Sequence, residues 1–234
     1  FMDRLKTTKE LPKTAAPPPE LFVEEFRRLV PLGDTILCIH PSAEVSGTVR
    51  SATVAKNEFP DADIRVIDTR LVASPLATLV QLAAEWSAEG TEADEIEARL
   101  FDLMRRARVY FLVDTLEYLA RGGRIGGAAR LLGSVLQIKP ILSLQGGKVE
   151  PYEKERTHKR AVGRLKEIVM EQIPMDGSGY LTVMHAGVPY AAQKLAFELG
   201  DCVHQPYVPI FDMPPAIVTH GGPGILGVAF FVKG

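Results

Sequence analysis

The chain has 234 residues, a length that fits one or two domains. Hydrophobic residues make up 46% and charged residues 24%, which supplies enough apolar side chain to build a core and argues against a disordered chain. The formal net charge of −2 provides no bulk attraction to nucleic acid or to an anionic membrane, so we expect neither as a main partner.

The cysteines and the apolar runs bear on the location of the protein. Cys38 and Cys202 each lie in an apolar run, which predicts buried thiols in a reducing cytoplasm rather than a disulfide framework. No run of about 18 apolar residues occurs, so we expect no integral membrane segment. The first six residues lack the apolar stretch of a signal peptide and look like the middle of an amphipathic helix, which predicts an N-terminally incomplete sequence.

The first part of the chain alternates predicted helices and strands. Residues 9–19 contain four prolines in positions 12–19, so this segment must be an extended loop. Helices are expected over residues 19–30, 48–59, 76–89 and 92–106. A strand buried on both faces is expected over residues 35–40, and a further strand over residues 64–68. This alternation with short connections is typical of a three-layer α/β domain with a parallel sheet.

The pattern changes near residue 108. Gln145-Gly146-Gly147 separates two predicted strands and indicates a hairpin. Strands are expected over residues 109–113, 138–144, 148–152, 180–184 and 228–232, and helices over residues 128–136, 157–171 and 191–199. Hairpins mixed with helices favour an α+β domain with a mixed or antiparallel sheet, so we predict an α/β domain over residues 1–107 and an α+β domain over residues 108–234.

Ser46-Gly47-Thr48 joins a predicted strand to a predicted helix. Ser46 would lie at or next to the N-cap, and Gly47 would let a ligand approach the backbone. The unpaired N–H groups and the dipole of the helix favour an anion there. The alternative is that Ser46 only caps the helix.

A glycine-rich loop follows in the second domain. Residues 121–127 contain four glycines, which allow left-handed backbone and close approach to a partner. Arg121 and Arg124 in such a loop can bind a carboxylate or a phosphate. The alternative is a flexible connector with solvated arginines.

Two further segments carry candidate residues. His220 precedes Gly221-Gly222-Pro223-Gly224, so backbone geometry would hold a side chain that can donate to a carboxylate or exchange a proton. The alternative is a tight turn with an incidental histidine. Arg156 precedes Thr157, the expected N-cap of a charged helix; Arg156 either faces solvent there or faces an anion or a partner protein.

The sequence favours binding over catalysis. The five histidines have no HxxxH or HExxH spacing and no CxxC occurs, so we expect no metal site. The chain has no GxSxG motif, no nucleotide-binding loop and no clustered Asp residues for Mg²⁺. We therefore expect no cofactor and no enzyme activity of the chain alone.

The motifs together resemble the DegV family of bacterial lipid-binding proteins, in order and over essentially the whole chain. The matching residues are Thr14, Val45-Ser46-Gly47-Thr48, Val66-Ile67-Asp68, Thr115-Leu116-Glu117-Tyr118-Leu119, Gly122-Gly123-Arg124-Ile125-Gly126, Lys139-Pro140-Ile141-Leu142, Glu155-Arg156-Thr157 and His220-Gly221-Gly222-Pro223-Gly224.

The resemblance implies a two-domain protein that holds one long-chain fatty acid, such as palmitate, in a tunnel with its carboxylate near the domain junction. Thr14 and Ser46 would contact the carboxylate, with Gly47 and Thr48 beside Ser46. Arg124 and His220 would lie near the head group.

The same resemblance implies a partner. Some family members carry the acyl chain for a bacterial fatty acid kinase, which phosphorylates the bound carboxylate. Arg156 and Arg121 would then serve the partner or the phosphoryl transfer. The alternatives are a small-molecule phosphotransferase subunit and a regulatory sensor whose bound lipid changes its surface.

The chain also departs from the family pattern. The family opens with a strand that ends in an Asp-Ser pair and a further βα segment, and neither occurs here. Ala15-Ala16-Pro17-Pro18 stands where the family has the more polar Ser-Gln-Pro-Ser, Val49 where an aromatic residue is common, and Thr69 where Ser is usual. These differences concern the details of the head-group site rather than the class of protein.

Overall fold

The computed structural model describes residues 1–133, 138–205 and 207–234. The chain divides into two compact units. The larger unit comprises Phe1–Thr14, Ala73–Pro75 and Arg106–Gly234, and the smaller unit comprises Ala15–Val72 and Leu76–Arg105.

Residues 1–14 correct the predicted division of the chain, which placed them in the first domain over residues 1–107. Helix α1 (Met2–Thr7) buries Leu5, and the apolar cluster around Leu5 includes Leu119 and Val218 of the larger unit. The N-terminal residues therefore pack with the larger unit because one face of α1 is apolar. The chain then enters the smaller unit at Ala15, within the Pro-rich loop (residues 8–18).

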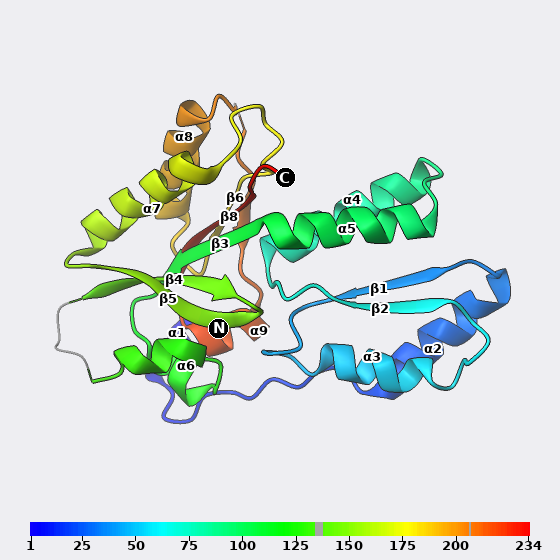
Figure 1. The fold of residues 1–234 in the computed structure, drawn as a ribbon. Helices are drawn as coiled ribbons and strands as arrows, with labels where there is room; N and C mark the ends of the chain where they lie inside the picture. Colours follow the sequence, from blue (N-terminus) through cyan, green and yellow to red (C-terminus); the bar gives the residue numbers. More distant parts are fainter. Residues whose placement is uncertain (134–137, 206) are drawn as a thin grey trace. The chain divides into compact units, whose positions relative to one another are not determined.

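The smaller unit has helices on both sides of a two-stranded parallel sheet (Figure 1). Alternate residues of its second strand face opposite layers: Ile64 and Val66 pack in a cluster with Phe26, whereas Arg65 binds Asp94. These two faces confirm the predicted three-layer arrangement. The elements are α2 (Pro19–Leu29), η1 (Val30–Leu32), β1 (Ile36–His40), α3 (Thr48–Lys56), β2 (Ile64–Asp68), α4 (Ser74–Ala88) and α5 (Ala93–Arg106).

The first strand is less buried than the sequence predicts. Residues 36–39 of β1 are half-buried, and only His40 at its end is buried. In the described sheet β1 pairs with β2 alone, so it does not have the two flanking strands of a central strand. The expectation that this strand is buried on both faces is wrong.

The larger unit is built on a six-stranded mixed sheet in the order β5-β4-β3-β8-β6-β7. The neighbouring strands are antiparallel except for the parallel pair β6 and β7. This confirms the predicted α+β architecture and the hairpin at Gln145-Gly146-Gly147. The strands are β3 (Ala107–Leu112), β4 (Lys139–Gln145), β5 (Lys148–Glu155), β6 (Thr182–His185), β7 (Ile210–Asp212) and β8 (Leu226–Phe231).

Successive residues of this sheet enter two different cores. Ile141 packs in the cluster formed with α7 (His158–Gln172) and α8 (Pro189–Cys202), and Leu142 packs in the cluster on the other face. That second cluster includes side chains of α1, α6 (Glu117–Arg121), η2 (Gly126–Leu131) and α9 (Pro215–Gly221). The period of two along a strand explains why one sheet supports both layers.

Several sequence expectations need correction or lie outside the described residues. The helix predicted over residues 128–136 is the 3₁₀ helix η2, and residues 134–136 of that prediction are not among those described. The sequence did not predict α6, β7 or α9, which are too short for a repeating apolar pattern to stand out. Cys202 is exposed at the end of α8 rather than buried. Among the described helices, none has the length and apolar character needed to cross a membrane.

Candidate functional site

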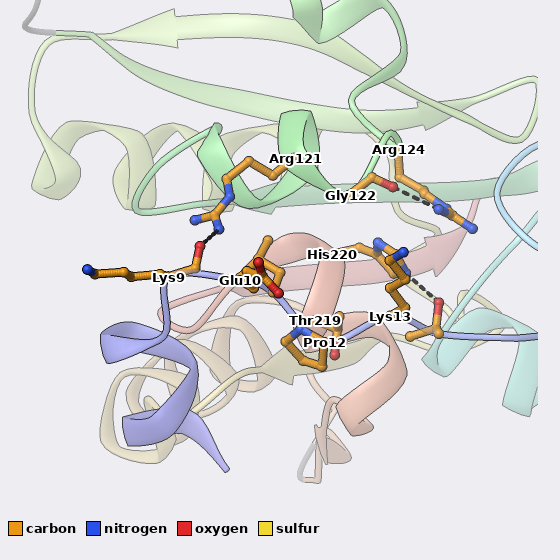
Figure 2. A pocket seen from close by; sticks show the side chains of 11 residues that line it. Lys9, Glu10, Pro12, Lys13, Arg121, Gly122, Arg124, Thr219 and His220 are labelled. Carbon is orange, nitrogen blue, oxygen red and sulfur yellow. Dashed lines mark hydrogen bonds between the residues drawn. The ribbon is translucent and has the colours of Figure 1, made fainter.

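Two polar residues from opposite ends of the chain meet in the larger unit. Thr14 lies in the Pro-rich loop and His220 in the last turn of α9. The Thr14 Oγ1 and His220 Nε2 atoms are 2.6 Å apart, a hydrogen bond between residues 206 positions apart in the sequence (Figure 2). The structure thus brings together two of the predicted head-group residues.

Glycines let the neighbouring backbone approach His220 closely. A Cβ atom added to Gly122 would overlap the His220 Nδ1 atom. Gly222 has a φ of 85°, which L residues rarely adopt, and a Cβ atom there would overlap the Tyr118 ring. The glycines of the two motifs are therefore required for packing around the imidazole.

The surroundings of His220 favour its neutral form. Burial lowers the pKa of His220 below its usual value, and the nearby Arg124 charge lowers the pKa further. At neutral pH the imidazole therefore carries one proton, and the Thr14 hydroxyl and the ring can each act as donor or acceptor in their hydrogen bond.

A pocket of about 690 Å³ surrounds this pair (Figure 2). Basic side chains predominate in its lining, where Glu10 is the acidic residue. Such a lining favours an anion over a cation or a neutral polar ligand. The lining residues are Lys9, Glu10, Leu11, Pro12, Lys13, Thr14, Arg121, Gly122, Arg124, Thr219 and His220.

Arg124 is held by the glycine loop (residues 122–127) itself. Its backbone N–H donates to the Leu119 carbonyl at 2.9 Å, and its Nη1 atom donates to the Gly122 carbonyl at 2.8 Å (Figure 2). The side chain is half-buried and lines the pocket. These bonds argue against the alternative of a loose connector with a solvated arginine at this position.

Arg121 fastens the Pro-rich loop to α6. Its Nη2 atom donates to the Lys9 carbonyl at 2.5 Å (Figure 2). Its Nη1 atom is 3.1 Å from the Glu117 carboxylate. The guanidinium thus holds the segment that leads to Thr14. A role of Arg121 toward a partner stays a prediction.

Ser46, Gly47 and Thr48 form a local turn in the smaller unit. Gly47 is the N-cap of α3, and Ser46 precedes it. The Ser46 Oγ atom accepts from the Thr48 N–H at 3.3 Å and lies 2.7 Å from the Thr48 Oγ1 atom. An added Cβ atom on Gly47 would lie 3.4 Å from the Ala16 Cβ atom, so the Pro-rich loop passes beside the turn. Contact of Ser46 with the carboxylate that Thr14 would bind stays a prediction.

A thiol–imidazole pair in β1 escaped the sequence analysis. Cys38 and His40 are two positions apart on a strand, so their side chains share a face, and the Sγ and Nε2 atoms are 2.9 Å apart. Burial raises the pKa of Cys38 to about 11 and lowers the pKa of His40. The thiol therefore stays protonated at neutral pH and is a poor nucleophile.

The residues that the structure describes contain no group of three or more His, Cys, Asp or Glu side chains able to hold a metal ion. Arg156 is exposed between β5 and α7. The neighbouring Thr157 caps α7, since its hydroxyl accepts from the Arg160 N–H at 3.2 Å, which confirms the predicted N-cap.

The family of the chain follows from a comparison with family models. The model described as "Uncharacterised protein, DegV family" matches residues 1–233. The chain belongs to the DegV family. A DegV domain-containing protein of Streptomyces coelicolor is 41% identical over 220 residues, which cover 92% of this chain and 76% of the relative. Protein DegV of Bacillus subtilis is 32% identical over 236 residues, which cover 100% of this chain and 83% of the relative.

Solved DegV structures share the fold. The crystal structure of a fatty acid binding DegV family protein from Streptococcus agalactiae matches with a TM-score of 0.90 and 30% identity, covering 99% of this chain and 82% of the other. A DegV family protein from Thermus thermophilus, described as binding fatty acid, matches with a TM-score of 0.90, 31% identity and the same coverage. These matches confirm the predicted DegV-like fold class.

Proposed function

We propose that this protein binds one long-chain fatty acid and that the carboxylate occupies the pocket around Thr14 and His220. The observation that carries the proposal is the hydrogen bond between these two side chains inside a pocket with a largely basic lining. The relatives from Streptococcus agalactiae and Thermus thermophilus, both described as fatty acid binding, support the same ligand class.

The pocket offers what a carboxylate needs when it leaves water. An ionised carboxylate inside a protein requires hydrogen-bond donors or positive charge, or else its pKa rises. If the His220 ring donates from Nε2 to the Thr14 Oγ1 atom, the Thr14 hydroxyl hydrogen is left to donate to the ligand. The Arg124 guanidinium adds positive charge at the same pocket.

The acyl chain supplies the affinity. Burying each methylene group is worth about 0.8 kcal/mol, so about 14 of them give a gross gain of roughly 11 kcal/mol before the costs of binding. Leu11 lines the pocket and, like Leu116 and Met213, packs against the apolar cluster around Leu5 and Leu119. We place the start of the acyl tunnel along these half-buried side chains.

The binding proposal is tested on lipid extracted from the purified protein. We expect mass spectrometry to find a long-chain fatty acid, and we expect added palmitate to raise the melting temperature of delipidated protein. The double substitution Thr14→Val with Ser46→Ala should weaken palmitate binding at least about tenfold, because donors to a charged group are lost. Thr53→Ala serves as the control, since its hydroxyl bonds the Val49 carbonyl on an exposed face of α3. Absence of any acyl chain together with no thermal shift would contradict the proposal.

The finer part of the proposal is that the protein presents its fatty acid to a kinase partner and does no chemistry alone. The exposed Arg156 is available to such a partner. In a reconstituted assay with a fatty acid kinase, Arg156→Ala should keep palmitate affinity and lower acyl phosphate formation. Arg160→Ala is the matched control, because Arg160 is exposed nearby and pairs with Glu155. ATP turnover by the isolated chain would instead favour a phosphotransferase, and a partner captured only by the lipid-bound form would favour a sensor.

A further inference from the structure

The glycine loop has a second attachment, on the side away from α6. The Gly127 N–H donates to the Glu150 Oε1 atom of β5 at 3.2 Å. A Cβ atom added to Gly127 would overlap both oxygens of that carboxylate. The glycine is therefore required at this position because the carboxylate lies directly against the backbone.

The residue before Gly127 lies equally close to β5. Gly126 has a φ of 52°, and a Cβ atom on it would overlap the Val149 carbonyl oxygen. Two successive glycines thus rest on two successive residues of one strand. Val149 is itself buried in the apolar cluster beneath η2, so this part of the strand is a fixed support.

The Glu150 side chain is suited to hold the loop. The Glu150 side chain is about one-quarter exposed, and the Arg130 guanidinium lies 3.7 Å from its carboxylate. A carboxylate that accepts from a backbone N–H makes a stronger bond than a neutral acceptor does. Glu150 therefore ties η2 to the sheet, at the start of the helix through Gly127 and near its end through Arg130.

We propose that Glu150 is a positioning residue that sets the place of Arg124 in the head-group pocket. Two anchors hold the loop at Arg124. The first is the bond of the Arg124 N–H to the Leu119 carbonyl, and the second is the contact of Gly126 and Gly127 with β5. Loss of the Glu150 carboxylate removes the Gly127 part of the second anchor and leaves only the contact of Gly126 with the Val149 backbone. This inference rests on the proposed function, since it concerns the affinity for the same fatty acid.

The test compares substitutions of Glu150 in delipidated protein with palmitate as the probe. Glu150→Ala should weaken palmitate binding by up to about tenfold, because the loop then holds Arg124 in its binding position for a smaller fraction of the time and the apparent affinity falls with that fraction. Glu150→Gln keeps an oxygen that can accept from the Gly127 N–H and should retain affinity within about threefold of the wild type. Glu150→Asp keeps the charge but is one methylene too short, so it should lose affinity like Glu150→Ala; the Asp and Gln variants decide the question if the Ala variant does not fold.

A matched control separates positioning from general stability. Glu153→Ala removes another β5 carboxylate, one that binds Arg164 rather than the glycine loop. This variant should change the melting temperature of the lipid-free protein and leave palmitate affinity unchanged. An equal loss of affinity in Glu153→Ala would overturn the proposal.

A double-mutant cycle with Arg124 gives the decisive readout. If Glu150 acts through Arg124, then Glu150→Ala should have almost no further effect on affinity in an Arg124→Ala protein. NMR of palmitate labelled with ¹³C at the carboxyl should show a raised carboxyl pKa in Glu150→Ala, as the guanidinium is no longer held near it. Additive losses, or an unchanged carboxyl pKa, would overturn the positioning role. Failure of the wild-type protein to bind palmitate would instead overturn the proposed function itself.

Discussion

The two regions that the sequence marks for the head group are built in different ways. In the smaller unit, Ser46 bonds Thr48, two positions away. In the larger unit, Thr14 bonds His220, which is 206 positions away. The first arrangement needs only a local turn, whereas the second needs α6, α9 and the Pro-rich loop to pack correctly. We therefore expect the pocket around His220 to be the more sensitive region to substitution.

The largest effect is expected at Gly222, which supports the long-range arrangement. Gly222→Ala must adopt a φ of 85° and must displace the Tyr118 ring. The backbone conformation costs about 1–3 kcal/mol and the overpacking about 1–3 kcal/mol, so we expect a loss of roughly 2–6 kcal/mol in the free energy of unfolding. Urea denaturation at constant m-value measures this loss.

Gly163 is the control for that substitution. It lies within α7, and an added Cβ atom would meet nothing within 4 Å. Gly163→Ala should therefore raise stability, by up to about 1 kcal/mol, because alanine favours the helix. Equal destabilisation by both substitutions would show that the close packing around His220 has no special role.

The second prediction concerns the Pro-rich loop. Thr14→Val removes the bond to His220 but keeps the shape of the side chain, so the loop should open more often. A bond worth about 1 kcal/mol corresponds to roughly fivefold faster tryptic cleavage after Lys9 and Lys13, provided that opening precedes cleavage. Mass spectrometry of a digestion time course measures the rates. Ser46→Ala should leave the cleavage rates after Lys9 and Lys13 unchanged. If Ser46→Ala accelerates cleavage as much as Thr14→Val does, the two regions do not differ in the way proposed.

The same contrast explains how much the sequence could predict. The Ser46 turn, the α7 cap at Thr157 and the β4–β5 hairpin depend on neighbours within a few residues, so sequence patterns predict them correctly. The glycine loop and the His220 motif were predicted as separate candidates. Their meeting in one pocket, and the bond between Thr14 and His220, depend on packing between distant segments and entered only through resemblance to a family.

Other features had no usable signal in the sequence. The support of the glycine loop by Glu150 joins β5 to η2, and no local pattern marks it. The predicted domain boundary follows chain order, whereas residues 1–14 pack with the larger unit because Leu5 is buried there. By contrast, the Cys38–His40 contact does have a signal in the sequence, because residues two positions apart on a strand share a face.

The third prediction uses the pH dependence of stability. The pKa of His220 is lowered in the folded state by burial and by Arg124, so below the unfolded value of about 6.5 the unfolded chain binds more protons. The stability contributed by neutral His220 is complete above that value and is lost as pH falls toward the folded pKa. The drop in the free energy of unfolding between pH 7.5 and pH 5 should therefore be smaller in His220→Gln than in the wild type.

The same measurement on a His40 variant tests the smaller unit. Its pKa is also lowered by burial, so His40→Gln should likewise reduce the acid-induced loss. The wild type, His220→Gln and His40→Gln contain the same titrating carboxylates. A difference in the pH dependence of their free energies of unfolding therefore reports on the substituted histidine. An identical pH profile for wild type and His220→Gln would show that His220 is not held neutral in the folded protein.

The smallest effect is expected at the local turn. Ser46→Ala removes the acceptor for the Thr48 N–H, but that bond is 3.3 Å long and Gly47 rather than Ser46 is the N-cap of α3. Water can reach this half-buried site and replace the bond, so we expect a loss of only about 0.5 kcal/mol in the free energy of unfolding. If Ser46→Ala nevertheless lowers the palmitate affinity strongly, Ser46 serves ligand binding rather than folding stability. If Ser46→Ala changes neither the palmitate affinity nor the stability, then only the larger unit binds the carboxylate. The turn at Ser46 would in that case be the start of a helix and no part of the binding site.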